Sequence, residues 1–217
     1  MFDPTKYHTH DLTLPYQKEI AGYDYDIART VEQDGWNART LHLYSHAGTH
    51  MDAPWHFGIA GATIDQFTPE QLMGEAWVVS IPIRVPQQLL TVADLGAVAT
   101  SLQAGDSLLL RTNWHQFLGH SKYRNELPRI SEALAEWCVQ RQVKMLGVEP
   151  PSVADVNNLA EVTSIHHILL KGAVIIIEGL ANLHQIKKEK VFLIALPLKI
   201  KDGDGAPARV IALEEKG

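Results

Sequence analysis

The sequence has almost no cysteine. Cys138 is the only one among 217 residues, so no disulfide can form within the chain. This argues against the disulfide-stapled scaffolds of small secreted proteins. The N-terminus lacks a basic start followed by an apolar run, which predicts that there is no signal peptide. Apolar runs such as residues 173–177 are far shorter than the ~20 residues that a membrane helix needs. We therefore expect a cytoplasmic protein with no membrane partner.

Basic residues are not in excess either. Lys and Arg number 19 against 25 Asp and Glu, which gives a net charge of −6. Nucleic-acid-binding proteins neutralise phosphates with positive charge, so we expect no nucleic-acid partner. The composition, 46% hydrophobic and 20% charged, is that of a globular protein. No repeat and no Gly/Ser-rich linker divides the chain, which predicts one domain over residues 1–217.

Short apolar runs alternate with helical patterns in the second half of the sequence. Runs of this length that are apolar on both faces are typical of central strands covered on both sides. Helices are indicated by apolar spacing of three and four residues, by capping residues and by glycines at the ends. The sequence therefore predicts an α/β fold. The expected strands are residues 77–81, 107–110, 144–148, 173–177 and 191–195, and the expected helices are residues 91–102, 130–138 and 161–171, the last followed by a C-terminal Gly172.

Histidine is abundant, with 11 in the chain and four between residues 42 and 56. In a helix, His46 and His50 would share a face but Asp52 would point about 240° away from His46. A straight strand would put His46 and His56 about 33 Å apart, too far for one metal centre. We therefore expect a strand that breaks at Gly48 into a folded loop, on which two imidazoles and a carboxylate converge.

Two histidines and one aspartate form a good ligand set for Zn²⁺ or another divalent ion of borderline softness. The alternative is a polar surface loop whose histidines serve only as hydrogen-bonding groups. A second cluster lies far along the chain, where Glu178 ends an otherwise apolar strand and His166 precedes it. A charge at that place is costly unless it is paired or bound to a cation. The alternative there is a strand that simply ends, with Glu178 in solvent and His166 on a helix surface.

Together these segments resemble the cyclase family of metal-dependent hydrolases, which includes bacterial kynurenine formamidases and isatin hydrolases. The signature His-x-Gly-Thr-His-x-Asp-x-Pro-x-His-Phe is matched at every fixed position from His46 to Phe57. The similarity extends over nearly the whole chain, through residues 110–114, 147–153, 177–180 and 196–210. The resemblance implies a swivelling β/β/α fold with a mixed central sheet, a homodimer or larger assembly, and one or two zinc or manganese ions.

The resemblance also implies a role for each matched residue. His46, His50 and Asp52 would ligate a first metal, and Asp52 would reach a second metal together with His166 and Glu178. His56 would be the catalytic acid/base. A bound metal lowers the pKa of water to about 7 and so supplies hydroxide for attack on an amide carbonyl. The imidazole of His56 titrates in the range needed to protonate the leaving amine.

One departure from the family pattern concerns the substrate. Kynurenine formamidases commonly carry a Trp-Pro-Gly-Asp stretch near the N-terminus, and here the corresponding stretch, residues 20–24, has no tryptophan. Tyr16, Tyr23, Tyr25 and Trp36 are the candidates for another aromatic wall. The leading expectation is an arylformamidase of tryptophan catabolism, which converts N-formylkynurenine to kynurenine and formate. The alternatives are hydrolysis of a cyclic amide such as isatin or of a lactone, a cyclase or dehydratase that does not hydrolyse, and a non-catalytic metal-binding protein.

Overall fold

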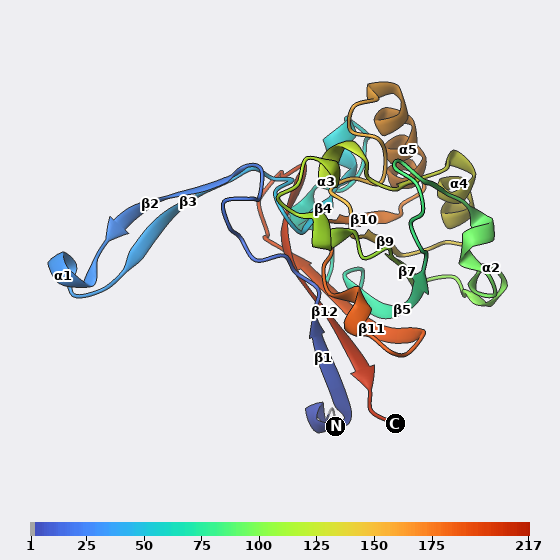
Figure 1. Ribbon diagram of the computed structural model, residues 1–217, viewed down its shortest axis with the longest axis horizontal. Helices are drawn as coiled ribbons and strands as arrows, with labels where there is room; N and C mark the ends of the chain where they lie inside the picture. Colours follow the sequence, from blue (N-terminus) through green and yellow to red (C-terminus); the bar gives the residue numbers. More distant parts are fainter. Residues whose placement is uncertain (1–2) are drawn as a thin grey trace.

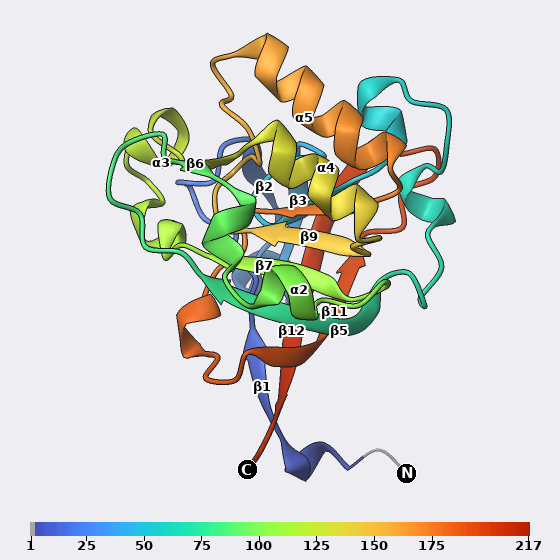
Figure 2. The same ribbon diagram turned by 90° about the vertical axis from the view of Figure 1, so that its right-hand side faces the viewer.

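The structure is a computed structural model that describes residues 3–217. Its centre is an eight-stranded sheet that closes on itself, because β4 pairs with β10 on one side and with β12 on the other (Figures 1 and 2). In spatial order the strands are β1 (Tyr7–Asp11), β12 (Gly205–Glu215), β11 (Lys190–Pro197), β5 (Met73–Ser80), β7 (Ser107–Arg111), β9 (Met145–Val148), β10 (Ile175–Glu178) and β4 (His50–Asp52).

The sheet is mixed. Strands β5, β7, β9 and β10 run parallel to one another, whereas β1, β4, β11 and β12 make antiparallel pairs. All five strand-length runs identified in the sequence are strands, and the expected α/β fold with a mixed central sheet is confirmed. The carboxyl ends of the parallel strands meet at one edge, the usual place for a ligand site in such sheets.

Both faces of the parallel strands are covered. Successive side chains of a strand point to opposite faces. Leu108 and Leu110 of β7 therefore join the core beneath the helices, while Leu109 joins the core inside the closed sheet. Cys138 is completely buried in the first of these cores. Burial on both faces explains why these strands are apolar throughout their length.

Two helices, α4 (Glu132–Gln140) and α5 (Leu159–Lys171), cover the outer face of the parallel strands (Figure 2). Ser131 and Asn158 cap their N-termini with side-chain oxygens. The remaining α-helices are single turns, α2 (Val98–Ser101), α3 (Lys122–Asn125) and α1 (Val31–Asp34). Short 3₁₀ turns, η1 to η6, span Pro4–Lys6, Pro54–Phe57, Ile64–Gln66, Val92–Leu95, Trp114–Phe117 and Leu183–Gln185, and two short strands, β6 (Leu89–Leu90) and β8 (Arg129–Ile130), pair with each other.

Two helix predictions need correction. The expected helix over residues 91–102 is broken into η4 and α2, because Gly96 between them has a positive φ of 53°. Gly172 does follow α5, but its φ is −81° and the left-handed residue is Ala173, with φ 60°. Gly172 is needed for space instead, since a Cβ at this position would lie 2.3 Å from a methyl carbon of Val139.

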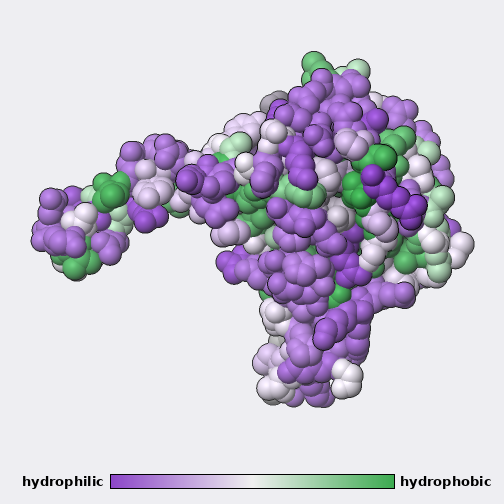
Figure 3. Space-filling view, viewed as in Figure 1, coloured by the Kyte–Doolittle hydropathy of each residue, from purple (hydrophilic) through white to green (hydrophobic). Residues whose placement is uncertain are grey.

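A long hairpin projects from the body of the molecule (Figure 1). We call it the arm; it consists of β2 (Tyr23–Arg29), the single-turn helix α1 and β3 (Ala38–Leu43). Apolar side chains lie exposed among its polar residues (Figure 3). They include Ile27, Val31, Trp36 and Leu41. Within residues 3–217, none of the helices has the length and apolar character required to cross a membrane.

Candidate metal centre

The His46–Phe57 segment begins in the turn after β3 and continues as one short strand. In this turn, Gly48 takes a positive φ of 62°. The break expected at Gly48 is therefore present. The chain then resumes as β4, a strand that the sequence pattern did not predict. Pro54 opens the 3₁₀ turn that carries His56.

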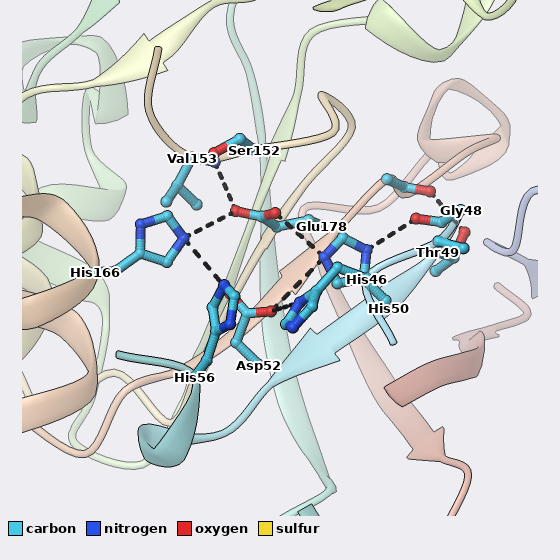
Figure 4. Close-up of polar contacts among 12 residues, drawn as sticks. His46, Gly48, Thr49, His50, Asp52, His56, Ser152, Val153, His166 and Glu178 are labelled. Atoms are coloured by element: carbon cyan, nitrogen blue, oxygen red, sulfur yellow. Dashed lines mark hydrogen bonds and ion pairs between the residues drawn. The ribbon is translucent and has the colours of Figure 1, made fainter. Parts of the chain in front are cut away.

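Pairing between β4 and β10 brings the two distant sequence clusters together. Glu178 is the direct cross-strand partner of His50, and Asp52 lies two residues further along β4 on the same face. His166 reaches the same point from α5. The side chains that the sequence analysis selected thus converge from β3–β4, β10, α5 and η2 (Figure 4).

Imidazole nitrogens surround the two carboxylates. His46 Nδ1 lies 2.8 Å and His50 Nε2 3.6 Å from Asp52 Oδ1. His166 Nε2 lies 3.5 Å from Asp52 Oδ2 and also 3.5 Å from Glu178 Oε1. His50 Nε2 approaches the other Glu178 oxygen at 3.3 Å. Asp52 therefore belongs to two overlapping groups of possible ligands, one with His46 and His50 and one with His166 and Glu178.

The cluster is buried, and one of its polar atoms has no hydrogen-bonding partner. His50, Asp52, His166 and Glu178 are each at most 4% exposed. Among the described residues, Asp52 Oδ2 is a buried oxygen without a hydrogen bond. A buried carboxylate oxygen of this kind is costly unless a ligand satisfies it. The three imidazoles and the two carboxylates, one of which contains this oxygen, form a donor set that suits a divalent cation.

Backbone packing holds the cluster in place. The Thr49 hydroxyl donates to the carbonyl of Gly179 at 2.6 Å and accepts from the Leu14 amide at 2.8 Å. Gly179 has a φ of 67°, and a Cβ there would lie 2.3 Å from the carbonyl oxygen of Gly48. The amide of Val153 donates to Glu178 Oε1 at 2.7 Å. The turn before β4 and the end of β10 are therefore fastened directly to each other.

His56 lies at the edge of the cluster. Its ring stacks on that of His46, with 3.8 Å between centroids. It is more exposed than the other histidines of the cluster, with 26% of its side chain accessible to solvent. Burial lowers the pKa of His56, which favours its neutral imidazole. A neutral, accessible imidazole next to a charged cluster can take up and release a proton.

The charges within the cluster stabilise one another. Burial opposes charge on His46, but the carboxylates of Asp52 and Asp204 outweigh it and raise its pKa to about 9. Burial likewise opposes charge on His166, yet Asp52 and Glu178 raise its pKa to about 10. The same contacts hold the pKa of Asp52 well below its usual range against the effect of burial. Without a cation, the carboxylates thus keep protons on these histidines.

A cavity of about 440 Å³ opens beside His46. Its wall includes Tyr44, whose ring centroid lies 5.5 Å from that of His46, together with Tyr123 and Arg124. The aromatic residues proposed from the sequence lie elsewhere or play another part. Tyr16 donates its hydroxyl to the carbonyl of Ala47, and Trp36 is exposed near the tip of the arm.

Two further carboxylates, one half-buried and one buried, were given no role by sequence reasoning. Asp204 Oδ2 lies 2.9 Å from His46 Nε2. Glu149 is completely buried, and it accepts hydrogen bonds from the amides of Thr112 and Trp114. Glu149 directly follows β9, and Asp204 directly precedes β12. Both lie in segments that resemble the cyclase family, and this resemblance was the one signal in the sequence that pointed to them.

Solved structures share this fold. Isatin hydrolase A from Ralstonia solanacearum aligns over 97% of this chain and 93% of its own, with a TM-score of 0.85 and 24% identity. An isatin hydrolase bound to the product analogue thioisatinate aligns over 98% and 94%, with a TM-score of 0.89 and 21% identity. The molecule therefore has the closed mixed α/β sheet of the isatin hydrolases.

Sequence comparison defines the family. The family model described as "Putative cyclase" matches residues 10–155. Kynurenine formamidase from Erythrobacter litoralis is 32% identical over 178 residues, which cover 82% of this chain and 77% of the relative. Kynurenine formamidase from Bacillus cytotoxicus is 28% identical over 214 residues, covering 93% and 95%. The chain belongs to the cyclase family.

If the cluster binds a divalent cation, the cation will stabilise the folded protein. For chelator-treated protein, Zn²⁺ or Mn²⁺ at about 100 times the dissociation constant should contribute about 2.7 kcal/mol. For a chain of this size, that raises the melting temperature by about 5–10 °C. In Asp52→Asn the increase should be lost, because Asp52 belongs to both ligand groups. Differential scanning calorimetry measures both.

The matched control is Asp24→Asn, the same substitution at an exposed position on the arm, which should keep the full increase. An equal metal-dependent increase in Asp52→Asn and in the unmodified protein would place metal binding outside the cluster.

Proposed function

We propose that this protein, with residues 1–217 acting as one domain, is a metal-dependent hydrolase of a C–N bond in a small amide. The leading substrate is N-formylkynurenine, which an arylformamidase converts to kynurenine and formate. The observation that carries the proposal is the convergence of two carboxylates and four histidines at the edge of the sheet. The formamidase relatives, which align with most of this chain, support the same reaction.

We assign His46, His50 and Asp52 to a first metal, and Asp52, His166 and Glu178 to a second. The unsatisfied Asp52 Oδ2 and the mixture of imidazole and carboxylate ligands fit zinc or manganese, as one ion or two. When bound, such an ion acts as a Lewis acid that polarises the amide carbonyl and lowers the pKa of water to about 7. The buried cluster that would hold the ion is shielded from bulk water, which would strengthen its electrostatic effect.

His56 is the proposed acid/base. The neutral imidazole accepts a proton from the attacking water and donates it to the amine as the C–N bond breaks. Its stacking on His46 places the ring next to the cluster, while its partial exposure leaves it open to substrate. A purely structural or storage site has no use for such a group, which argues against the non-catalytic alternative.

The cavity beside His46 supports a small aromatic substrate. Its volume of about 440 Å³ is typical of pockets that bind small molecules. Tyr44 offers a ring surface for stacking, and Arg124 offers positive charge for a carboxylate. N-formylkynurenine has both an aryl ring and a carboxylate. The structural similarity to isatin hydrolases favours a cyclic amide as the second candidate.

We also propose a homodimer or a larger homo-oligomer, located in the cytoplasm. An isolated two-stranded hairpin is only marginally stable in water. The arm is such a hairpin, and it leaves Ile27 68% and Trp36 58% exposed. Packing of the arm against a second copy would bury these side chains. The single cysteine suits a reducing compartment.

The assigned role of His56 predicts a loss of turnover without a loss of metal. His56→Ala should reduce kcat for N-formylkynurenine by about 10²–10⁴-fold, the usual contribution of acid–base catalysis. Its metal content, measured by atomic emission, should not change. His42→Ala, at an exposed position on β3, is the matched control and should keep full activity. Full activity of His56→Ala would remove the residue from the mechanism.

The reaction class is tested with the same assay. Mass spectrometry of products from N-formylkynurenine and from isatin distinguishes hydrolysis, which adds one water, from cyclisation or dehydration. Turnover of isatin alone would move the assignment to the second candidate.

If the arm packs against a second copy of the chain, removing its exposed apolar side chains should weaken the oligomer. Trp36→Ser together with Leu41→Ser should shift the mass measured by light scattering from the oligomer toward the monomer, because both side chains lose their apolar contact surface. Leu159→Ser is the matched control, since Leu159 is 79% exposed at the start of α5, outside the arm. A monomeric unmodified protein, or an arm variant that stays oligomeric, would contradict the proposal.

A further inference from the structure

Each histidine in the proposed ligand set has an inner nitrogen, which faces Asp52 or Glu178, and an outer nitrogen, which points away from these two carboxylates. The outer nitrogen of His50, Nδ1, lies 3.0 Å from the carbonyl of Gly48. The outer nitrogen of His166, also Nδ1, lies 2.7 Å from the carbonyl of Val162. A carbonyl only accepts hydrogen bonds, so in both rings the outer nitrogen carries a proton, and the inner nitrogen is the one that can give a lone pair to a bound cation.

His46 differs from the other two histidines. Its inner nitrogen, Nδ1, lies 2.8 Å from Asp52, but its outer nitrogen, Nε2, meets the carboxylate of Asp204 at 2.9 Å. An ionised carboxylate is the stronger acceptor, so this contact orients the ring and raises the basicity of the inner nitrogen more than a carbonyl does.

Asp204 is itself held in place. Its backbone carbonyl accepts from the amide of Ala53, at 2.9 Å, and its side chain accepts from the hydroxyl of Ser45, at 3.3 Å. The next residue, Gly205, lets the ring of His46 pack against β12, since a Cβ there would lie 2.7 Å from its Cε1. Asp204, just before β12, and Gly205, its first residue, thus fix the position of the His46 ring.

The same carboxylate oxygen also reaches His56. Asp204 Oδ2 lies 3.6 Å from His56 Nδ1, and the His56 ring stacks on the ring of His46. Within residues 3–217, Asp204 is the one carboxylate within ion-pair distance of His56. One oxygen therefore faces both a proposed metal ligand and the proposed acid/base (Figure 4 shows the two rings).

We propose that Asp204 is a positioning residue for this site. Its hydrogen bond holds the His46 ring with Nδ1 toward the metal position. Its charge attracts His56 Nδ1 from 3.6 Å, which leaves His56 Nε2 for proton transfer. The inference rests on the proposed metal centre, but it concerns a residue outside the six assigned there. It predicts two separable effects, one on metal affinity and one on turnover.

Metal affinity tests the contact with His46. Partners that orient metal-binding histidines typically contribute 10–100-fold to metal affinity. Asp204→Asn should therefore weaken Zn²⁺ binding by that factor, measured by competition with a chromophoric chelator and without any activity assay. Asp202→Asn, which removes the same charge from the same loop at an exposed position, should bind within twofold of the unmodified protein.

Turnover of metal-saturated protein tests the contact with His56. In Asp204→Asn, kcat for N-formylkynurenine should fall at least tenfold while KM stays within about twofold, because the aspartate does not bind substrate. Asp204→Glu keeps the negative charge at this half-exposed position and should recover most of the lost metal affinity.

Unchanged affinity and unchanged kcat in Asp204→Asn, in a protein that melts at the normal temperature, would overturn the role of Asp204 alone. Equal losses in Asp202→Asn would replace positioning by a general effect of loop charge and also overturn it. Failure of the unmodified protein to bind Zn²⁺ or Mn²⁺ would overturn the proposed metal centre and this inference with it.

Discussion

The structure of the site depends on the burial of two carboxylates side by side. Asp52 is 1% exposed and Glu178 4% exposed. Burial disfavours the ionised form of each, and the charge of Asp52 further opposes that of Glu178. Both stay ionised because the imidazoles of His46, His50 and His166 face them. Positive charge at this point, carried by protons or by a divalent cation, is what allows the fold to keep the pair.

Closure of the sheet creates the conditions for that pair. Asp52 on β4 lies opposite Ile176 of β10 on one side and opposite Gly205 of β12 on the other. The first pairing sets His50 against Glu178, and the second brings Asp204 to His46. A three-residue strand thus joins the proposed ligands and the proposed positioning residue, which are more than 100 residues apart in the sequence. In this protein the short length of β4 is compensated by two pairing partners.

Local patterns were sufficient to predict much of this arrangement. The apolar runs predicted the parallel strands, and the spacing of His46, His50 and Asp52 excluded both a helix and a straight strand through the motif. The family resemblance then linked this motif to His166 and Glu178, and the structure brings all five side chains together.

Other features depend on tertiary contacts and left no local signal. Asp204 meets His46 across 158 residues of sequence, so no spacing rule could reveal the contact. Gly172 resembles an ordinary helix-ending glycine, yet it is required by the side chain of Val139 on another helix. Tyr44 lines the cavity because it directly follows β3, where the chain returns from the arm to the body of the molecule. The length of the arm could not be predicted from the alternation of apolar and polar residues alone.

We propose that a metal held by this cluster makes the protein an amide hydrolase. The most direct measurement is the initial rate of N-formylkynurenine hydrolysis by chelator-stripped protein before and after addition of Zn²⁺ or Mn²⁺. The account predicts negligible hydrolysis without metal and restoration by one or both ions. Equal rates with and without metal, or no hydrolysis of this substrate and of isatin by protein shown to have bound metal, would contradict it.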